Sequence, residues 1–158
     1  TGDESAALDV TGMIGQYAHG NEPGHHVPYL YNHVGQYHKT QALVDSILYN
    51  LYRNEPDGLC GNEDVGQMSA WYVFSAMGLY PVCPGKPYYA LGRPLFDKVV
   101  LHLENGKTLV IEAENNHRKN KYVSSVFFNG KPLTDMQLSH FNLMQGGTLK
   151  FLMKAGDE

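Results

Sequence analysis

The spacing of hydrophobic residues changes near residue 82 from a helical pattern to an alternating one. The clearest helix is predicted over residues 40–53, with Thr40 as its N-cap. Its apolar positions recur three or four residues apart: Leu43, Val44, Ile47, Leu48 and Leu51. Shorter helices are expected over residues 5–18 and 25–34. A further helix over about residues 66–78 is apolar nearly all round, so we expect it to be buried.

Two polar loops separate these helices. In the first, residues 19–26, Pro23 disfavours a helical conformation at Glu22. In the second, residues 62–64, Asp64 is a candidate cap for the following helix. In a toroid of helical hairpins, loops two connections apart emerge at the same end. We therefore expect Glu22 and the second loop to meet at one rim.

The rest of the chain predicts β-structure. Three prolines make residues 81–87 an irregular linker, and strands are expected over 88–91, 98–103, 108–113, 122–128 and 148–153. Asn105-Gly106 is a strong hairpin signal. Apolar residues alternate on the strands around it, at Leu101, Leu103, Leu109 and Ile111, which predicts one buried face. The expected fold class is α+β, with helical hairpins in residues 1–82 and a small antiparallel β-sandwich in residues 83–158.

The composition of the chain argues against several classes of function. The chain has 158 residues, 42% of them hydrophobic and 18% charged, which suits one ordered domain or two small ones. A net charge of −4 argues against a nucleic-acid binder, because no basic stripe is available to neutralise phosphates. No apolar run is long enough to span a bilayer. Cys60 and Cys83 permit one disulfide, and free thiols fit equally well; their spacing is not that of a metal site.

The first polar loop carries three histidines around Glu22: His19, His25 and His26. Such a cluster can bind zinc, but no His-x-x-x-His or cysteine pair accompanies it. A loop that recognises a ligand is the preferred interpretation, and a solvated loop is the other alternative.

The two loops together suggest a sugar site. Glu22 and Asp64 are carboxylates presented beside His, Asn, Tyr and Trp, which bind hydroxyl groups or stack on pyranose rings. The structural alternatives are an N-cap for Asp64 and a core position for Trp71. No Gly-x-Ser-x-Gly motif and no phosphate-binding loop is present, which disfavours serine hydrolase and nucleotide chemistry.

Two long motifs carry a family resemblance: residues 15–26, GQYAHGNEPGHH, and residues 58–75, GLCGNEDVGQMSAWYVFS. With residues 28–32 and 78–85, they closely resemble glycoside hydrolase family 92. The similarity covers essentially the whole chain, but it matches only the C-terminal part of a longer architecture. The resemblance implies an N-terminal β-sandwich, an (α/α)6 toroid, and calcium-dependent exo-acting α-mannosidases that invert the anomeric centre. Members are often secreted or periplasmic.

The resemblance also implies roles for individual residues. Asp64 matches the general base that activates water, and Asn62 matches a position that is an aspartate in some members. Because an amide cannot usefully accept a proton, we assign the base to Asp64 and a positioning role to Asn62. Glu22 matches a sugar contact near calcium and is the preferred metal ligand of this chain. Asn21 and His25 are expected to contribute sugar or metal contacts.

The general acid of the family lies outside this chain. We therefore expect a C-terminal fragment of an α-mannosidase that acts on terminal α-mannosidic bonds, with α-1,2 as the expected linkage, and that is inactive alone. Its expected partners are a mannose-containing glycan and the N-terminal part of the same enzyme. An uncovered apolar helix face favours self-association. The competing interpretation is a non-catalytic carbohydrate-binding or interaction module built on the β half.

Overall fold

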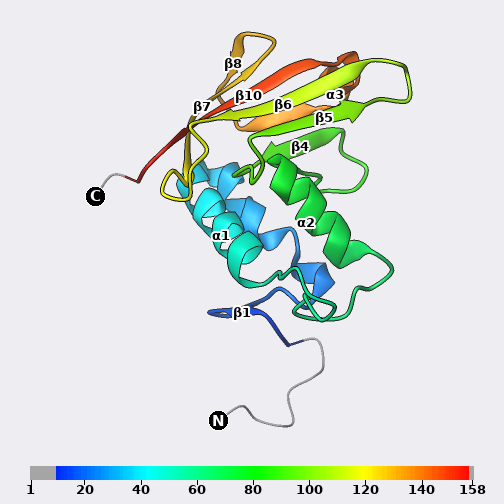
Figure 1. Cartoon of the computed structure of the whole chain (residues 1–158), viewed down its shortest axis with the longest axis vertical. Coiled ribbons are helices and arrows are strands. Elements are labelled where there is room, and N and C mark those ends of the chain that lie inside the picture. Colours follow the sequence, from blue (N-terminus) through cyan, green and yellow to red (C-terminus); the bar gives the residue numbers. More distant parts are fainter. Residues whose placement is uncertain (1–9, 157–158) are drawn as a thin grey trace.

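The computed structural model describes residues 10–156, which form a helical part below and a β part above (Figure 1). The helical part contains β1 (Met13–Ile14), β2 (Tyr17–Ala18), the 3₁₀ helices η1 (Glu22–Gly24) and η2 (Val27–Val34), and the α-helices α1 (Tyr37–Asn50) and α2 (Gln67–Met77). Within the described residues no helix is long and apolar enough to cross a membrane.

A small β-hairpin replaces most of the first predicted helix. Strands β1 and β2 pair with Met13 opposite Ala18, so the prediction of a helix up to residue 18 was wrong. The cause is local: Gly12 and Gly15 both have φ of +61°, a left-handed conformation that turns the chain. Residues 5–9 of that predicted helix lie outside the described residues.

The other helices are confirmed with corrections. The segment predicted over 25–34 is helical but of the tighter 3₁₀ type. Helix α1 begins at Tyr37 after Gln36, so Thr40 is a buried position inside the helix and not its cap. Helix α2 buries one side only, because Val73 is 52% exposed. Glu22, expected to be non-helical, begins the one-turn helix η1.

The β part consists of two sheets. The larger has the order β5-β6-β10-β7-β8 and the smaller the order β3-β4-β9. Their strands and one short helix are β3 (Leu79–Tyr80), β4 (Tyr88–Leu91), β5 (Lys98–His102), β6 (Thr108–Glu114), β7 (Tyr122–Phe128), β8 (Lys131–Leu133), β9 (Gln137–Ser139), α3 (His140–Gln145) and β10 (Gly147–Lys154). The five predicted strands are confirmed, whereas β3, β8, β9 and α3 were missed.

One strand pair corrects the antiparallel prediction. Strand β10 runs parallel to β6, with Leu149 opposite Ile111, and antiparallel to β7. A parallel pair needs a long crossover, which β7, β8, β9 and α3 supply. The β5–β6 hairpin around Asn105-Gly106 is confirmed, with Leu101 opposite Leu109.

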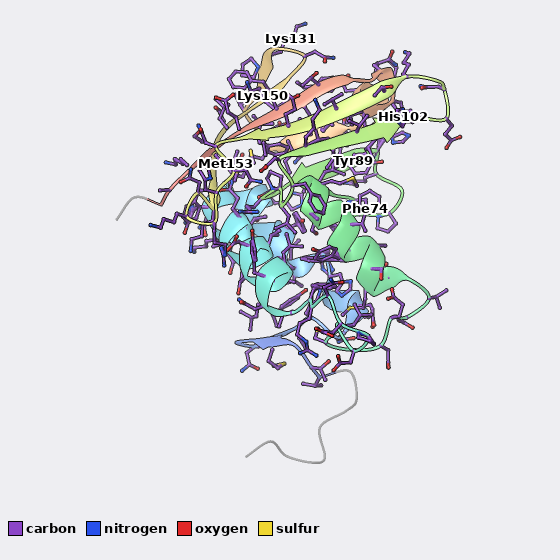
Figure 2. All side chains as sticks on the ribbon, viewed as in Figure 1. Phe74, Tyr89, His102, Lys131, Lys150 and Met153 are labelled. Atoms are coloured by element: carbon purple, nitrogen blue, oxygen red, sulfur yellow. The ribbon has the colours of Figure 1, made fainter. Side chains whose placement is uncertain are left out.

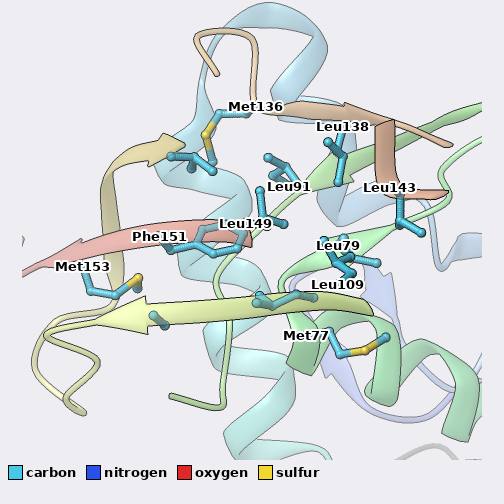
Figure 3. Close-up of a cluster of buried hydrophobic side chains, with 13 residues drawn as sticks. Met77, Leu79, Leu91, Leu109, Met136, Leu138, Leu143, Leu149, Phe151 and Met153 are labelled. Carbon is cyan, nitrogen blue, oxygen red and sulfur yellow. The ribbon is translucent and has the colours of Figure 1, made fainter. Parts of the chain in front are cut away.

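The two sheets enclose one hydrophobic core (Figure 3). Leu91 and Leu138 come from the small sheet, and Leu149 and Phe151 come from the large one. Met77, the last residue of α2, belongs to the same core. Burial of such side chains contributes roughly 1.5–3 kcal/mol each, so this core is the main source of stability in the β part.

The helical part has its own core and is tied to the β part. Its buried side chains surround Trp71 and include Tyr29, Val44, Ile47 and Leu48. Phe74 on α2 lies beside Tyr89 on β4, with ring centroids 6.4 Å apart (Figure 2). Helix α1 packs on η2 and α2, but a complete (α/α)6 toroid stays a prediction. The division at residues 82 and 83 also stays a prediction.

A buried ion pair makes a second link between the parts. Asp45 on α1 accepts hydrogen bonds from Arg118 Nη1 at 2.9 and 3.2 Å, and Arg93 Nε lies 3.2 Å from its Oδ1. Both Asp45 and Arg93 are almost fully buried. The guanidinium of Arg118 also covers the Tyr49 ring at 3.9 Å.

Candidate functional site

A cavity of about 610 Å³ opens where η1, the start of α2 and the segment after β3 meet. This volume is within the usual range of ligand sites, roughly 300–1,000 Å³. The wall combines two carboxylates with histidine, amide and aromatic side chains. Its residues are Glu22, Pro23, His25, His26, Asp64, Gln67, Ala70, Trp71, Phe74, Tyr80, Pro81, Val82 and Pro84. The two polar loops therefore meet at one place, as the sequence predicted.

Two glycines let the loops touch. A Cβ on Gly61 would lie 2.9 Å from the Cα of Gly20, and a Cβ on Gly20 would lie 3.2 Å from the carbonyl oxygen of Cys60. Both glycines begin the same tripeptide, Gly-Asn-Glu. The backbones of the loops are in direct contact, which fixes Glu22 relative to the second loop.

The backbone turns sharply after Glu63. Asp64, Val65 and Gly66 have φ of +52°, +57° and +91°. Left-handed backbone costs about 1–3 kcal/mol for a non-glycine residue, and it is most unusual for a β-branched one such as Val65. This strained turn directs Asp64 to the cavity at the entrance of α2.

Glu63, and not Asp64, caps helix α2. The Glu63 carboxylate accepts hydrogen bonds from the backbone N–H of Ser69 at 2.9 Å and from the Ser69 hydroxyl at 2.7 Å. Asp64 contributes only its carbonyl, which accepts from the N–H of Gln67 at 3.2 Å. Within residues 10–156 the Asp64 and Glu22 carboxylates accept no hydrogen bond. Both are therefore open to a ligand or to water.

His25 is a buried residue that holds the cavity wall together. Its Nε2 donates to the carbonyl of His19 at 2.9 Å, and its Nδ1 accepts from the Gln67 amide at 3.0 Å. The tautomer follows from these partners, because a carbonyl only accepts. Burial lowers the pKa of His25, which keeps the ring neutral. With both nitrogens engaged, neither is left for a metal.

Trp71 holds the same loop in place through a hydrogen bond to its backbone. Its Nε1 donates to the carbonyl of His25 at 3.0 Å, and the indole is fully buried. The ring stacks on Tyr52 and meets the His19 ring edge to face, with centroids 4.5 Å apart. The structural interpretation of Trp71 as core is confirmed. It supports the cavity wall as well.

His19 is buried beneath the cavity between two phenols. Its Nδ1 lies 2.7 Å from the Tyr17 hydroxyl, and its Nε2 lies 2.7 Å from the Tyr52 hydroxyl. Tyr52 in turn donates to the carbonyl of Met68. Burial, with a smaller effect of His25, lowers the pKa of His19 to about 3. Burial raises the pKa of both tyrosines, so the whole network is neutral at pH 7.

The remaining predicted residues lie away from the cavity wall. Asn21 and Asn62 are exposed on the two loops and do not line the cavity. Gln67 and Tyr80 also line the cavity and were missed; the Gln67 amide donates to Nδ1 of His25. The available signal for Gln67 was a polar residue at the first position of an otherwise apolar helix.

The described residues do not by themselves form a metal site. Across residues 10–156 no three His, Cys, Asp or Glu side chains converge in a way that could hold an ion. Calcium takes 6–8 oxygen ligands, of which Glu22 can supply one or two. The three histidines around Glu22 form no such group within residues 10–156, so the structure gives no support to the zinc alternative. Cys60 and Cys83 are both free thiols.

Comparison with known proteins identifies the family of this chain. The family described as "Glycosyl hydrolase family 92 catalytic domain" matches residues 2–155. A protein of Arthroderma benhamiae described as an uncharacterized secreted glycosidase is 31% identical over 137 residues, which are 85% of this chain and 18% of that protein.

Two solved structures from Bacteroides thetaiotaomicron are similar to this chain. The family GH92 α-mannosidase BT3965, in complex with mannoimidazole, is 41% identical with a TM-score of 0.90, over 95% of this chain and 20% of its own. The inverting mannosidase BT2199 is 50% identical with a TM-score of 0.84, over 90% of this chain and 19% of its own. The chain spans about a fifth of the length of these relatives. It belongs to glycosyl hydrolase family 92.

Proposed function

We propose that the chain is the part of an α-mannosidase that supplies the water-activating side of the active site. The substrate is a terminal α-linked mannose of a glycan, and the α-1,2 bond is the proposed linkage. The observation that carries this proposal is the pair of carboxylates, Glu22 and Asp64, that line one cavity without structural hydrogen bonds. A buried or capping carboxylate would be occupied; these two are available for substrate and water.

Asp64 is the proposed general base. An inverting glycosidase activates water on one face of the sugar while an acid protonates the leaving oxygen on the other. The left-handed turn at Asp64 and Val65 fixes the direction of this carboxylate. Glu63 holds the end of the turn by capping α2, so the base does not also have to stabilise the helix. Asn62, exposed two residues earlier, is a positioning group in this proposal.

Glu22 is the proposed contact for the sugar in the innermost subsite. Its loop is held by Trp71 and Gln67 through His25. Asn21 is proposed to reach the substrate from outside the cavity wall. His25 acts through the wall that it holds, because both of its ring nitrogens are used within the protein.

The rest of the machinery is proposed to come from elsewhere in the enzyme. The general acid lies outside this chain, so residues 1–158 alone are expected to be inactive. Calcium, when bound, would polarise sugar hydroxyl groups, with Glu22 as the ligand from this chain and further oxygens from other segments. We propose an exported enzyme, in line with the description of the fungal relative as secreted.

Self-association of the isolated chain also stays a prediction. Val27, Leu30 and Val34 on η2 are exposed, which leaves an apolar surface on the helical part. Elution volume measured across a hundredfold range of concentration tests this prediction.

The function is tested by incubating the complete enzyme with α-1,2-mannobiose and following the products by ¹H NMR. The proposal expects β-mannose to appear first, because the reaction inverts the anomeric centre. A chelator should abolish release, and calcium should restore it. Release of α-mannose first would contradict inversion, and no release at all would contradict the proposed activity.

A further inference from the structure

The strained turn that carries Asp64 is closed by the backbone of Met68. The N–H of Met68 donates to the carbonyl oxygen of Glu63 at 3.2 Å, so one hydrogen bond spans Asp64, Val65 and Gly66. Left-handed backbone at a non-glycine residue persists only where the surrounding structure over-determines it. The side chain of Val65 is fully exposed and does not contribute to this. The direction of Asp64 therefore depends on how firmly Met68 is held.

Tyr52 holds Met68 in place from a different segment of the chain. Its hydroxyl donates to the Met68 carbonyl at 3.0 Å, in the first turn of α2. Tyr52 itself comes shortly after α1, where its backbone pairs with Leu59. Its ring stacks on Trp71 with an interplanar angle of 1° and lies 4.8 Å from the Tyr72 ring. These contacts fix the position from which the hydroxyl reaches α2.

The direction of each hydrogen bond in this network follows from its last acceptor. A carbonyl oxygen only accepts, so the Tyr52 hydroxyl proton is directed at Met68. The Tyr52 oxygen then accepts from Nε2–H of His19 at 2.7 Å, and Nδ1 of the neutral ring accepts from the Tyr17 hydroxyl at 2.7 Å. His19 is completely buried. Because the proton and the oxygen of Tyr52 are both engaged, its hydroxyl has one orientation.

We propose that Tyr52 is a positioning residue for the proposed general base: its hydrogen bond to Met68 keeps the left-handed turn closed and Asp64 directed into the cavity. The inference rests on the proposed function, because it takes Asp64 as the base. A general base must hold its carboxylate within hydrogen-bonding reach of the attacking water. Misplacement of a reacting group by about 1 Å can lower the rate by about 10²-fold. Tyr52 acts through Met68 and does not itself line the cavity.

The test compares two tyrosines whose hydroxyls donate to the same helix. Tyr29 donates to the Ser75 hydroxyl at 2.8 Å, in the second half of α2 and away from the turn. In the complete enzyme acting on α-1,2-mannobiose, Tyr52→Phe should lower kcat by about 10-fold or more and change KM by less than about 2-fold. Tyr29→Phe is the matched control and should change kcat by less than about 2-fold, although it also removes a hydrogen bond to α2. A general loss of stability would not distinguish the two variants in this way.

Hydrogen–deuterium exchange of the complete enzyme examines the turn without substrate. The peptide over residues 61–69 should exchange at least about 5-fold faster in Tyr52→Phe than in the wild type, because the Met68 N–H is then less firmly held. Tyr29→Phe should exchange there at the wild-type rate. If Tyr52→Phe does not fold, Tyr52→Phe combined with Val65→Gly replaces it, since glycine adopts the φ of +57° without strain. This double variant should have a lower kcat than Val65→Gly alone.

Three results would overturn the proposal: wild-type kcat in a folded Tyr52→Phe enzyme, wild-type exchange of its turn, or an equal loss of kcat in Tyr29→Phe. A failure of the proposed function gives a different result. Faster exchange of the turn in Tyr52→Phe, together with no mannose release by the wild type, would support the hold of Tyr52 on the turn and contradict the proposed hydrolysis.

Discussion

The indole Nε1 of Trp71 donates a hydrogen bond to the carbonyl oxygen of His25 at 3.0 Å, which joins helix α2 to the loop that carries Glu22. Asp64 lies just before the same helix. One side chain therefore relates the positions of the two carboxylates that line the cavity.

Replacement of Trp71 by Phe should show how much stability this hydrogen bond contributes, because the Phe ring preserves much of the packing. The His25 carbonyl would lose its partner in a buried place, which costs about 1–3 kcal/mol. We expect urea unfolding to show this loss, while Trp71→Ala costs about 3–5 kcal/mol because it also leaves a cavity. Equal stability of Trp71→Phe and the wild type would show that the hydrogen bond does not hold the loop.

Gly61 should not tolerate a methyl group. Gly61→Ala would place a Cβ 2.9 Å from the Cα of Gly20, and overpacking of this kind costs about 1–3 kcal/mol. Gly24→Ala is the matched control, because its Cβ would meet nothing closer than 3.7 Å. Thermal unfolding should distinguish the two variants. If Gly61→Ala is as stable as Gly24→Ala, the loops are not in the described contact.

The buried ion pair should matter more than an exposed one. Asp45→Ala leaves Arg93 buried without its partner, and a broken buried pair costs about 3–5 kcal/mol. Asp57→Ala removes the exposed pair with Arg53 and should have little effect. Denaturant midpoints measure the difference, and similar midpoints for both variants would contradict it.

His19 should make the chain sensitive to acid. Its pKa in the folded chain is about 3, below the ordinary value of 6.5, so the unfolded chain takes up a proton first as the pH falls. The stability is complete above pH 6.5 and is lost between there and pH 3, by at most about 1.4 kcal/mol per pH unit from this residue. His19→Gln should flatten the dependence of the unfolding free energy on pH. An unchanged slope would exclude His19 as its source.

The sequence predicted the parts of the fold that depend on local pattern. Helix α1 and the five longer strands follow from apolar spacing, and the β5–β6 hairpin follows from Asn105-Gly106. The parallel pairing of β10 with β6 depends on contacts far apart in sequence, and no local pattern encodes it. The helix predicted over residues 5–18 failed because Gly12 and Gly15 take left-handed conformations, which outweigh weak apolar spacing.

The site was predicted in part. Glu22 and Asp64 do line one cavity, and their loops meet where Gly61 lies against Gly20. The prediction of Asp64 as the helix cap was wrong, because the adjacent Glu63 carboxylate accepts the hydrogen bonds from Ser69. Only the left-handed turn at Asp64 decides which carboxylate folds back onto Ser69. The burial of His25 could not be predicted from local sequence either, because its partners Gln67 and Trp71 are more than forty residues away.

The two adjacent carboxylates have different expected roles, with Asp64 as the proposed base and Glu63 as the helix cap. The direct measurement is kcat for mannose release from α-1,2-mannobiose by the complete enzyme, in Asp64→Asn and Glu63→Gln variants whose unfolding is followed in parallel. Asp64→Asn should lower kcat by about 10²–10⁴-fold with wild-type stability. Glu63→Gln should lower stability by about 0.5–2 kcal/mol. Wild-type kcat in a folded Asp64→Asn enzyme would contradict the proposed role of Asp64 as the general base.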